Sequence, residues 1–491
     1  MGIIQKQGLR SSVFLMIGFV IGAINLLFLF PKVLSQEEIG LTRALIDAGT
    51  VLSVLATLGT VPVIYKFYPY YKALGRRNDL AYLTGMICLV GFIIICLLGF
   101  FFNDFIVRKL GKSPLFASNV ILVYPLTLLM LSFTWMEAFG WALKKAVVTN
   151  FLKETLVRII TTILILLAWA GAISKGTFVN YFSLIYFLPV IILATVLLKS
   201  GDFTFTKEPS RVTTRFKDKM FTFGLFVFGA TFLNVASRTV DSFMIIGLKG
   251  LAETAIFTYA AYLGAFMDLP LRSINSVATP ILSESWKDKK YTNIATVYRK
   301  STITLLVAGL FIFLIALLSI NNLVSFLGKG WEQVPAIFLI MGLAKIVDLG
   351  TGVNGQIIST SSNWRFDFYT NVMLTVVAFP LNFFLIKYFG IIGAAFSNLA
   401  AIIIFNGVRF SFIYKKYGWQ PYGFVHVKII LVSALIFIAV YEIPFIINIY
   451  IDTVFRSVLF SGLFVPAMLR MNVSEEFSLT ARNFLNKVRR R

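Results

Sequence analysis

The chain has 491 residues, of which 58% are hydrophobic and 14% are charged, and its mean hydropathy is +0.84. A water-soluble core cannot bury so much apolar surface, and apolar runs of about 20 residues recur along the whole length, so the sequence indicates an integral membrane protein. The net charge of +23 does not indicate nucleic acid, because the basic residues gather in loops between apolar runs. With one histidine and two cysteines, the sequence does not suggest a metal site rich in histidine.

The pattern predicts an all-α fold with about fourteen membrane-spanning helices. The expected spans are residues 12–34, 41–65, 80–102, 116–140, 151–173, 177–199, 219–247, 254–282, 296–320, 334–359, 368–388, 390–413, 426–446 and 453–471. The first apolar run is too long for a signal peptide, so it is expected to be a retained helix. Most of the 45 Lys and Arg residues fall on the side that the two termini share, which predicts that both termini are cytoplasmic.

A repeated turn divides the chain. The segment 38–41 (EIGL) follows the first span and 253–256 (ETAI) follows the seventh, while Pro62 and Pro280 are expected to close the helices that come next. We expect two pseudo-symmetric six-span lobes, 1–200 and 219–413, with a cavity between spans 1, 2, 7 and 8. The other expected parts are a basic interfacial linker at 201–218, two extra spans at 426–471 and a basic cytoplasmic tail at 472–491.

Span 10 contains a Gly-x-Gly-x-x-Gly string formed by Gly350, Gly352 and Gly355. A dinucleotide site needs such a string between a strand and a helix, and here it lies inside an apolar helix. We interpret it as a hinge where the helix bends beside a polar cavity, and Pro270 in span 8 as another. Since the sequence shows no pattern typical of a catalytic site, we expect neither an enzyme nor a cofactor.

Charged residues occur inside the predicted spans, where each is costly. Opposite charges lie three or four residues apart, hence on one face of a helix, in these pairs: Arg43 and Asp47, Glu154 and Arg158, Arg238 and Asp241, Asp268 and Arg272, Lys345 and Asp348. They either neutralise one another between helices or face a water-filled cavity. The functional interpretation is favoured in spans 8 and 10, because Pro270 and the glycines allow the helix to bend or unwind beside the charges.

Three turns have a distinctive sequence: EIGL after span 1, the end of span 7 with its following turn (240–247, VDSFMIIG, and 255–260, AIFTYA), and 389–398 (FGIIGAAFSN) between spans 11 and 12. They resemble the turns of bacterial polysaccharide exporters. These are the O-antigen and capsule flippases of the superfamily that also holds MATE drug exporters and lipid II flippases. The resemblance covers the whole chain in length, span count and span order.

The resemblance implies a flippase that moves an undecaprenyl-diphosphate-linked oligosaccharide from the inner to the outer leaflet of the bacterial cytoplasmic membrane by alternating access, for surface polysaccharide assembly. The basic residues that it implies for the diphosphate are Arg272, Lys345, Arg43 and Arg238. The acidic residues that would balance charge, or couple transport to a Na⁺ or H⁺ gradient, are Asp47, Asp241, Asp268 and Asp348. Expected partners are the lipid-linked oligosaccharide, membrane lipids, and a polysaccharide polymerase with other assembly proteins.

Two other functions stay open. A MATE-type exporter of organic cations is expected to have an unpaired carboxylate deep in the N-terminal lobe, and the nearest candidate, Asp47, has Arg43 one turn away. A membrane-embedded glycan polymerase or glycosyltransferase generally needs a substantial outer loop, and the expected outer loops are short.

Overall fold

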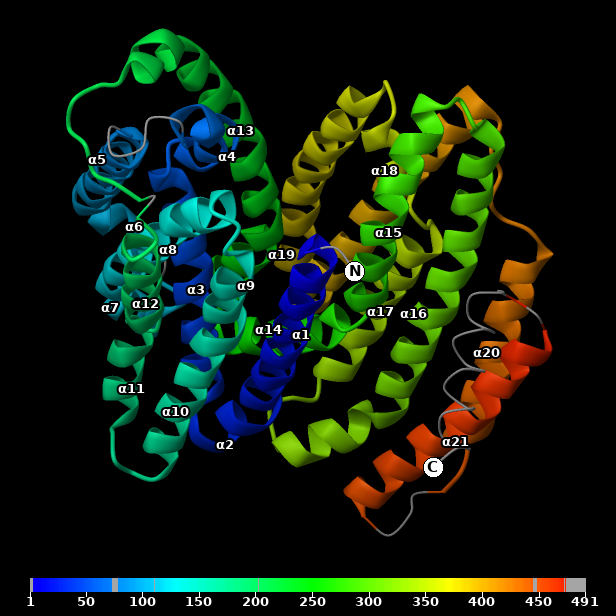
Figure 1. Ribbon diagram of the computed structural model, residues 1–491. Coiled ribbons are helices and arrows are strands. Elements are labelled where there is room, and N and C mark those ends of the chain that lie inside the picture. The colour runs from blue at the N-terminus through cyan, green and yellow to red at the C-terminus, as the bar shows by residue number, and fades with distance from the viewer. Residues whose placement is uncertain are drawn as a thin grey trace. The chain divides into compact units, whose positions relative to one another are not determined.

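The computed structural model describes residues 3–72, 78–109, 111–201, 203–444, 448–471 and 473. Every regular element in these ranges is a helix, and the chain divides into two compact units, Met1–Ala255 and Ile256–Arg491 (Figure 1). The predicted all-α fold of a multi-pass membrane protein is confirmed. The predicted basic tail lies outside the described residues except for residue 473, and the predicted division into symmetric lobes stays a prediction.

The first unit is a bundle of long helices joined by short helical turns. Its elements are α1 (Ile3–Ile24), the π-helix η1 (Asn25–Leu29), α2 (Phe30–Val33), α3 (Gln36–Ala56), α4 (Thr60–Lys72), α5 (Leu80–Phe101), α6 (Asn103–Lys109), α7 (Pro114–Ser118), the 3-10 turn η3 (Val120–Leu122), α8 (Val123–Ala142), α9 (Ala146–Asn150), the π-helix η4 (Phe151–Leu156), α10 (Val157–Trp169), α11 (Lys175–Phe182), α12 (Phe187–Leu198) and α13 (Arg211–Leu248).

The helix α14 (Leu251–Ala265) crosses from the first unit into the second. The second unit continues with α15 (Asp268–Lys287), α16 (Tyr291–Leu327), α17 (Val334–Gly350), α18 (Asn354–Thr360), α19 (Trp364–Tyr417), α20 (Phe424–Tyr441) and α21 (Ile449–Arg470). In this unit α20 and α21 pack against α16, so the last two predicted spans are part of a compact body.

Each predicted span falls on helix, although several are interrupted. Among the described residues, ten helices are long and apolar enough to cross a membrane, or eleven when α17 and α18 are counted as one bent span. The helix α19 carries two predicted spans, on either side of Gly390, whose φ of 65° breaks the helical path. Span 5 begins with the π-helix η4 and continues as α10, and span 8 is broken at residues 266–267, so neither is a single long α-helix.

The two copies of the repeated turn begin similar elements. Glu38 forms a reciprocal capping box with Ser35 at the start of α3, and Glu253 lies in the first turn of α14. An acidic residue stabilises this end of a helix because the helix dipole is positive there. The helical path breaks after each of these helices. It continues as α4 after α3 and as α15 after α14.

The two prolines do not close these helices, and that part of the sequence interpretation is wrong. Pro62 lies in the first turn of α4, where its missing N–H removes no helical hydrogen bond. Pro280 lies inside α15, which continues past it to Lys287. Proline is tolerated within membrane helices when neighbouring groups satisfy the freed backbone.

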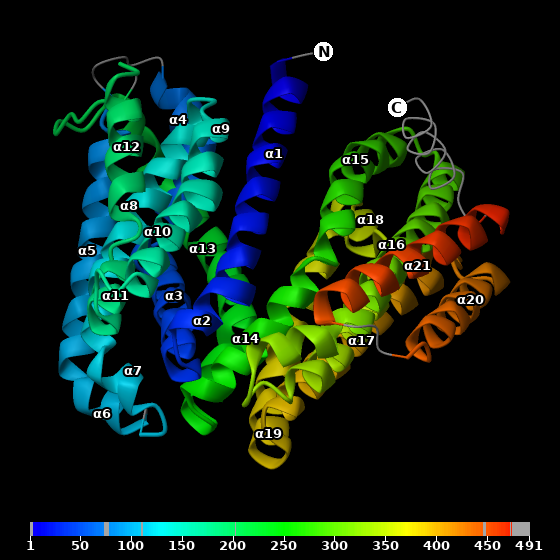
Figure 2. The same ribbon diagram turned by 90° about the horizontal axis from the view of Figure 1, so that it is seen from below.

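The helices α3 and α13 pack closely in an antiparallel pair (Figure 2). A Cβ atom at Gly40 would overlap the carbonyl group of Leu251, and one at Gly59 would overlap that of Gly224. Only glycine allows backbones to approach this closely. These two contacts fix the register, because the start of α3 lies beside the end of α13 and the break after α3 lies beside Gly224.

The stretch between α12 and α13 is docked on the first unit through an aromatic side chain. Phe203 is only 7% exposed, and its ring centroid lies 5.1 Å from that of Phe139 and 5.6 Å from that of Trp135. Both partners belong to α8. Rings at this separation contribute stabilisation beyond the apolar area that they bury.

Hydrogen bonds then fix the start of α13. Ser210 caps the helix by accepting a hydrogen bond from the backbone N–H of Thr213. The carboxylate of Asp79 accepts hydrogen bonds from the backbone N–H of Ser210 at 2.9 Å and from the hydroxyl of Thr213 at 2.7 Å. Since α13 begins at Arg211, residues 211–218 of the expected linker form its first turns.

We expect Phe203→Ala to lower the free energy of unfolding by about 3–5 kcal/mol, because it removes a buried ring from the core of the first unit. Phe205→Ala is the matched control, since Phe205 lies two residues away and is 55% exposed. The thermal unfolding midpoint of the detergent-purified protein should fall clearly for the first variant and little for the second. Equal midpoints would contradict the docking of this stretch.

Candidate functional site

The expected charge pair on α3 is present. The Nε atom of Arg43 donates to Oδ2 of Asp47 at 2.7 Å, and the side chains are 39% and 5% exposed, respectively. A carboxylate this deeply buried needs a basic partner to offset its lost hydration. Asp47 is therefore neutralised by Arg43 and is not the unpaired carboxylate expected of a site for organic cations.

The expected pair between Arg238 and Asp241 on α13 is not formed. Arg238 is exposed and makes no salt bridge within the described ranges, while Asp241 is half-buried. Three residues along a helix place two side chains on neighbouring positions but do not require contact between them. Arg238 is thus an accessible cation within a predicted membrane span.

The charges of α15 and α17 that the sequence singled out pair between the two helices and not along either one. The Nζ atom of Lys345 on α17 donates to Oδ1 of Asp268 on α15 at 2.7 Å, and both side chains are partly exposed. The expected pairs of Asp268 with Arg272 and of Lys345 with Asp348 are therefore wrong. Asp268 is the first residue of α15, directly after a helix break, and from there it reaches the neighbouring helix.

This leaves Arg272 as a second accessible cation. It is exposed, and among the residues that the structure describes it has no salt-bridge partner. Ser276, Thr279 and Ser283 follow at helical spacing and are at least partly exposed, which gives α15 a polar face. A polar face on a membrane helix is stable when it meets water, protein or a polar ligand.

Span 10 is broken at its glycines. The helices α17 and α18 are bent by 47° with respect to each other, and Gly352 in the break has a φ of 66°. Gly350 is the last residue of α17, and Gly355 is the second residue of α18. Pro270, by contrast, lies in the first turn of α15, just after the break at 266–267.

A hydrogen-bond network closes this break. The side chains of Thr351 and Asn354 each donate to Oδ1 of Asn406 at 2.9 Å, and Nδ2 of Asn406 donates to Oδ1 of Asp348 at 3.0 Å. These polar groups satisfy one another where the helical hydrogen bonds are lost. The sequence analysis missed Asn406, because its place on α19 gave no sign that it lies near span 10.

Gly355 leaves room for a buried arginine. A Cβ atom there would lie 2.7 Å from Nη1 of Arg409. Arg409 forms a salt bridge with Asp367 and donates from Nε to the hydroxyl of Thr370 at 3.1 Å. The arginine is thus held by α19 itself, and it packs directly against the start of α18.

A further ion-pair cluster lies in the first unit and was only partly expected. Arg158 donates to Glu154 at 3.1 Å, as predicted, and Lys153 donates to Oε2 of Glu137 at 2.9 Å. Lys153 and Glu154 belong to the π-helix η4, whose backbone hydrogen bonds join residues five apart instead of four, a form often found at functional sites. Sequence spacing could not reveal the second pair, because Glu137 lies on a different helix.

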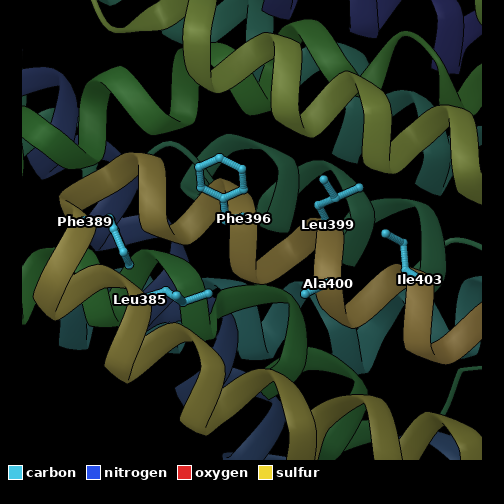
Figure 3. A pocket seen from close by; sticks show the side chains of 6 residues that line it. All are labelled: Leu385, Phe389, Phe396, Leu399, Ala400 and Ile403. Carbon is cyan, nitrogen blue, oxygen red and sulfur yellow. The ribbon is translucent and has the colours of Figure 1, made fainter.

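A groove between the two arms of α19 is entirely apolar (Figure 3). It has a volume of about 390 Å³ and is lined by Leu385, Phe389, Phe396, Leu399, Ala400 and Ile403. Its lining offers no charged side chain that could bind a phosphate, so this groove suits hydrocarbon and is separate from the charged positions.

No family model matches the sequence. No curated protein matches it either. Among solved structures, the lipid II flippase MurJ in an inward closed conformation has a TM-score of 0.72 at 16% identity, with 94% of this chain and 98% of that chain covered. The chain has the fold of this flippase.

Two structures described as a multidrug resistance MATE family transporter of the MOP superfamily share the fold as well. The inward-facing conformation of a multidrug resistance transporter has a TM-score of 0.61 at 14% identity, covering 83% of this chain and 99% of that one. The outward-facing conformation has a TM-score of 0.53 at 13% identity, covering 84% and 98%. The first of these structures faces inward and the second faces outward.

We expect Gly352→Ala to destabilise the protein by about 1–2 kcal/mol from the left-handed backbone alone. A further cost arises because the new Cβ atom would lie 2.6 Å from Oγ of Ser301. At Gly350 the nearest atom would be a side-chain carbon 3.8 Å away, so Gly350→Ala is the control and should be neutral. The measurement is the thermal midpoint in detergent; a Gly352→Ala protein as stable as Gly350→Ala would refute the broken conformation.

Proposed function

We propose that this chain is a flippase for an undecaprenyl-diphosphate-linked oligosaccharide, which it moves from the inner to the outer leaflet of the bacterial cytoplasmic membrane by alternating access. The product would be used to assemble surface polysaccharide such as O-antigen. The supporting observation is that Arg238 and Arg272 are exposed in predicted membrane spans without a salt-bridge partner among the described residues. An arginine in such a position needs water or an anionic ligand to compensate its charge.

A diphosphate suits each of these residues chemically. A guanidinium group presents parallel N–H donors that match two phosphate oxygens, which an ammonium group cannot reproduce. In the first unit Arg43 would add positive charge from its position beside Asp47, and in the second unit Lys345 would do so from its position beside Asp268. These paired carboxylates, with Asp241 and Asp348, are the proposed charge partners, and coupling to a Na⁺ or H⁺ gradient would act through one of them.

The fold supports a flippase over an enzyme. The similarity to MurJ extends over 94% of this chain, and MurJ is a lipid II flippase. Under this proposal both termini are cytoplasmic, a polysaccharide polymerase acts on the delivered lipid, and the chain itself makes no glycosidic bond. Movement at the break in span 10, between Gly350 and Gly355, and beside Pro270 stays part of the proposal.

A MATE-type exporter of organic cations is the second candidate, because MATE transporters share the fold. Its chemistry needs an available carboxylate. Asp47 and Asp268 are each paired with a base, and Asp348 accepts a hydrogen bond from Asn406. The accessible charges at these positions are cationic, which favours an anionic substrate.

We expect Arg272→Glu and Arg272→Ala to abolish delivery of surface polysaccharide, and Arg272→Lys to retain part of it, because lysine keeps the charge but not the two-point geometry. The measurement is polysaccharide recovery in cells that lack their own flippase, with membrane protein levels determined in parallel.

The matched control is Arg365→Glu, since Arg365 is also exposed but lies in the first turn of α19, near a span end. It should support normal recovery. Normal recovery by Arg272→Glu would remove this residue from the binding site, and equal loss for both variants would assign the effect to charge reversal in general.

A further inference from the structure

The middle of α13 carries polar side chains that the charge-pair analysis did not include. Thr231 and Asn234 are exposed and precede Arg238 by seven and four residues, so the three lie on one face of the helix. The Thr231 hydroxyl donates to the carbonyl oxygen of Val227 at 2.9 Å. The Asn234 side chain forms no hydrogen bond to any residue in the described ranges.

The side of α13 that carries Asn234 is packed against protein at both ends of the helix. Phe223 lies eleven residues before Asn234, and Ile245 lies eleven residues after it, which is about three turns in each direction. The Phe223 ring centroid is 6.1 Å from that of Phe67 on α4, and Ile245 is fully buried. Asn234 is therefore exposed on a side of α13 that packs against protein three turns before it and three turns after it.

The close contacts between α3 and α13 lie on either side of this stretch. The contacts of Gly40 with Leu251 and of Gly59 with Gly224 bracket both helices. The segment 234–238 of α13 lies between these two contacts in sequence, as does the pair of Arg43 and Asp47 on α3.

An amide side chain at this depth is best satisfied by a neutral polar ligand. Asn offers two donors and one acceptor and carries no charge, and a hydroxyl group also both donates and accepts. In hydrocarbon, an unsatisfied amide costs several kcal/mol, so a ligand with several hydroxyl groups fits the position.

We propose that Asn234 binds the first sugar of the lipid-linked oligosaccharide while Arg238 holds the diphosphate, an inference that rests on the proposed function. The first sugar is joined directly to the second phosphate, so the two groups are neighbours in the ligand. Asn234 and Arg238 are one helical turn apart, about 6 Å along the axis. This spacing fits a phosphate and the sugar attached to it.

The test compares two probes, undecaprenyl diphosphate and the same lipid bearing one N-acetylglucosamine, by native mass spectrometry of the purified full chain. Asn234→Leu removes the amide but keeps a side chain suited to a membrane helix. We expect it to weaken binding of the glycosylated probe about 5- to 10-fold, as for the loss of one or two hydrogen bonds, and to leave the bare diphosphate unchanged. Thr222→Val is the control, since Thr222 is exposed on the same helix and its hydroxyl already donates to the backbone carbonyl oxygen of Asp218.

Arg238→Ala separates this inference from the proposed function, because it should weaken the binding of both probes by the same factor. Two results would overturn the sugar site and leave the flippase proposal standing. In the first, Asn234→Leu binds each probe as tightly as wild type does. In the second, Asn234→Leu loses the same factor in affinity for both probes. If Arg238→Ala bound both probes as well as wild type does, the diphosphate site on α13 would be wrong, and the sugar site that depends on it would fall as well.

Discussion

The cost of placing a charge inside a membrane helix is the constraint on which this arrangement depends. A carboxylate or guanidinium away from water must be offset by another charge, by polar groups or by a ligand. Arg43 offsets Asp47 on one helix, and Lys345 offsets Asp268 between two helices. Arg238 in the first unit and Arg272 in the second are exposed and have no salt-bridge partner among the described residues, so their charge needs another form of compensation.

The breaks in the helices belong to the same arrangement. A helix interrupted inside a membrane exposes backbone groups that need polar partners. At span 10 these partners are side chains, since Asn406 joins Thr351, Asn354 and Asp348 into one network. The break is therefore a packed and satisfied element, and glycine at position 352 is required by its positive φ.

Much of the fold could be predicted from the sequence. Long apolar runs mark the spans, and acidic residues mark the first turn of a helix, so both features can be recognised without knowing which helices are neighbours. The pair of Arg43 and Asp47 was predicted for the same reason, as were the glycines at which span 10 breaks. Asp268 was assigned to the wrong partner, since spacing along α15 cannot show that α17 is nearer. Asn234 was missed because the sequence shows only an uncharged polar residue inside an apolar run. Such residues are common in membrane helices, and only the structure shows that this one is exposed.

The most direct test of the central claim is a leaflet assay in vesicles that contain this chain as their only protein. Undecaprenyl-diphosphate oligosaccharide with a labelled sugar would be placed in one leaflet, and a glycosidase that cannot cross the membrane would be added on the other side. If the chain is a flippase, label should be released much faster than from protein-free vesicles, and the glycan mass of the remaining lipid should be unchanged. Release no faster than in protein-free vesicles, or a glycan extended by new sugars, would contradict it.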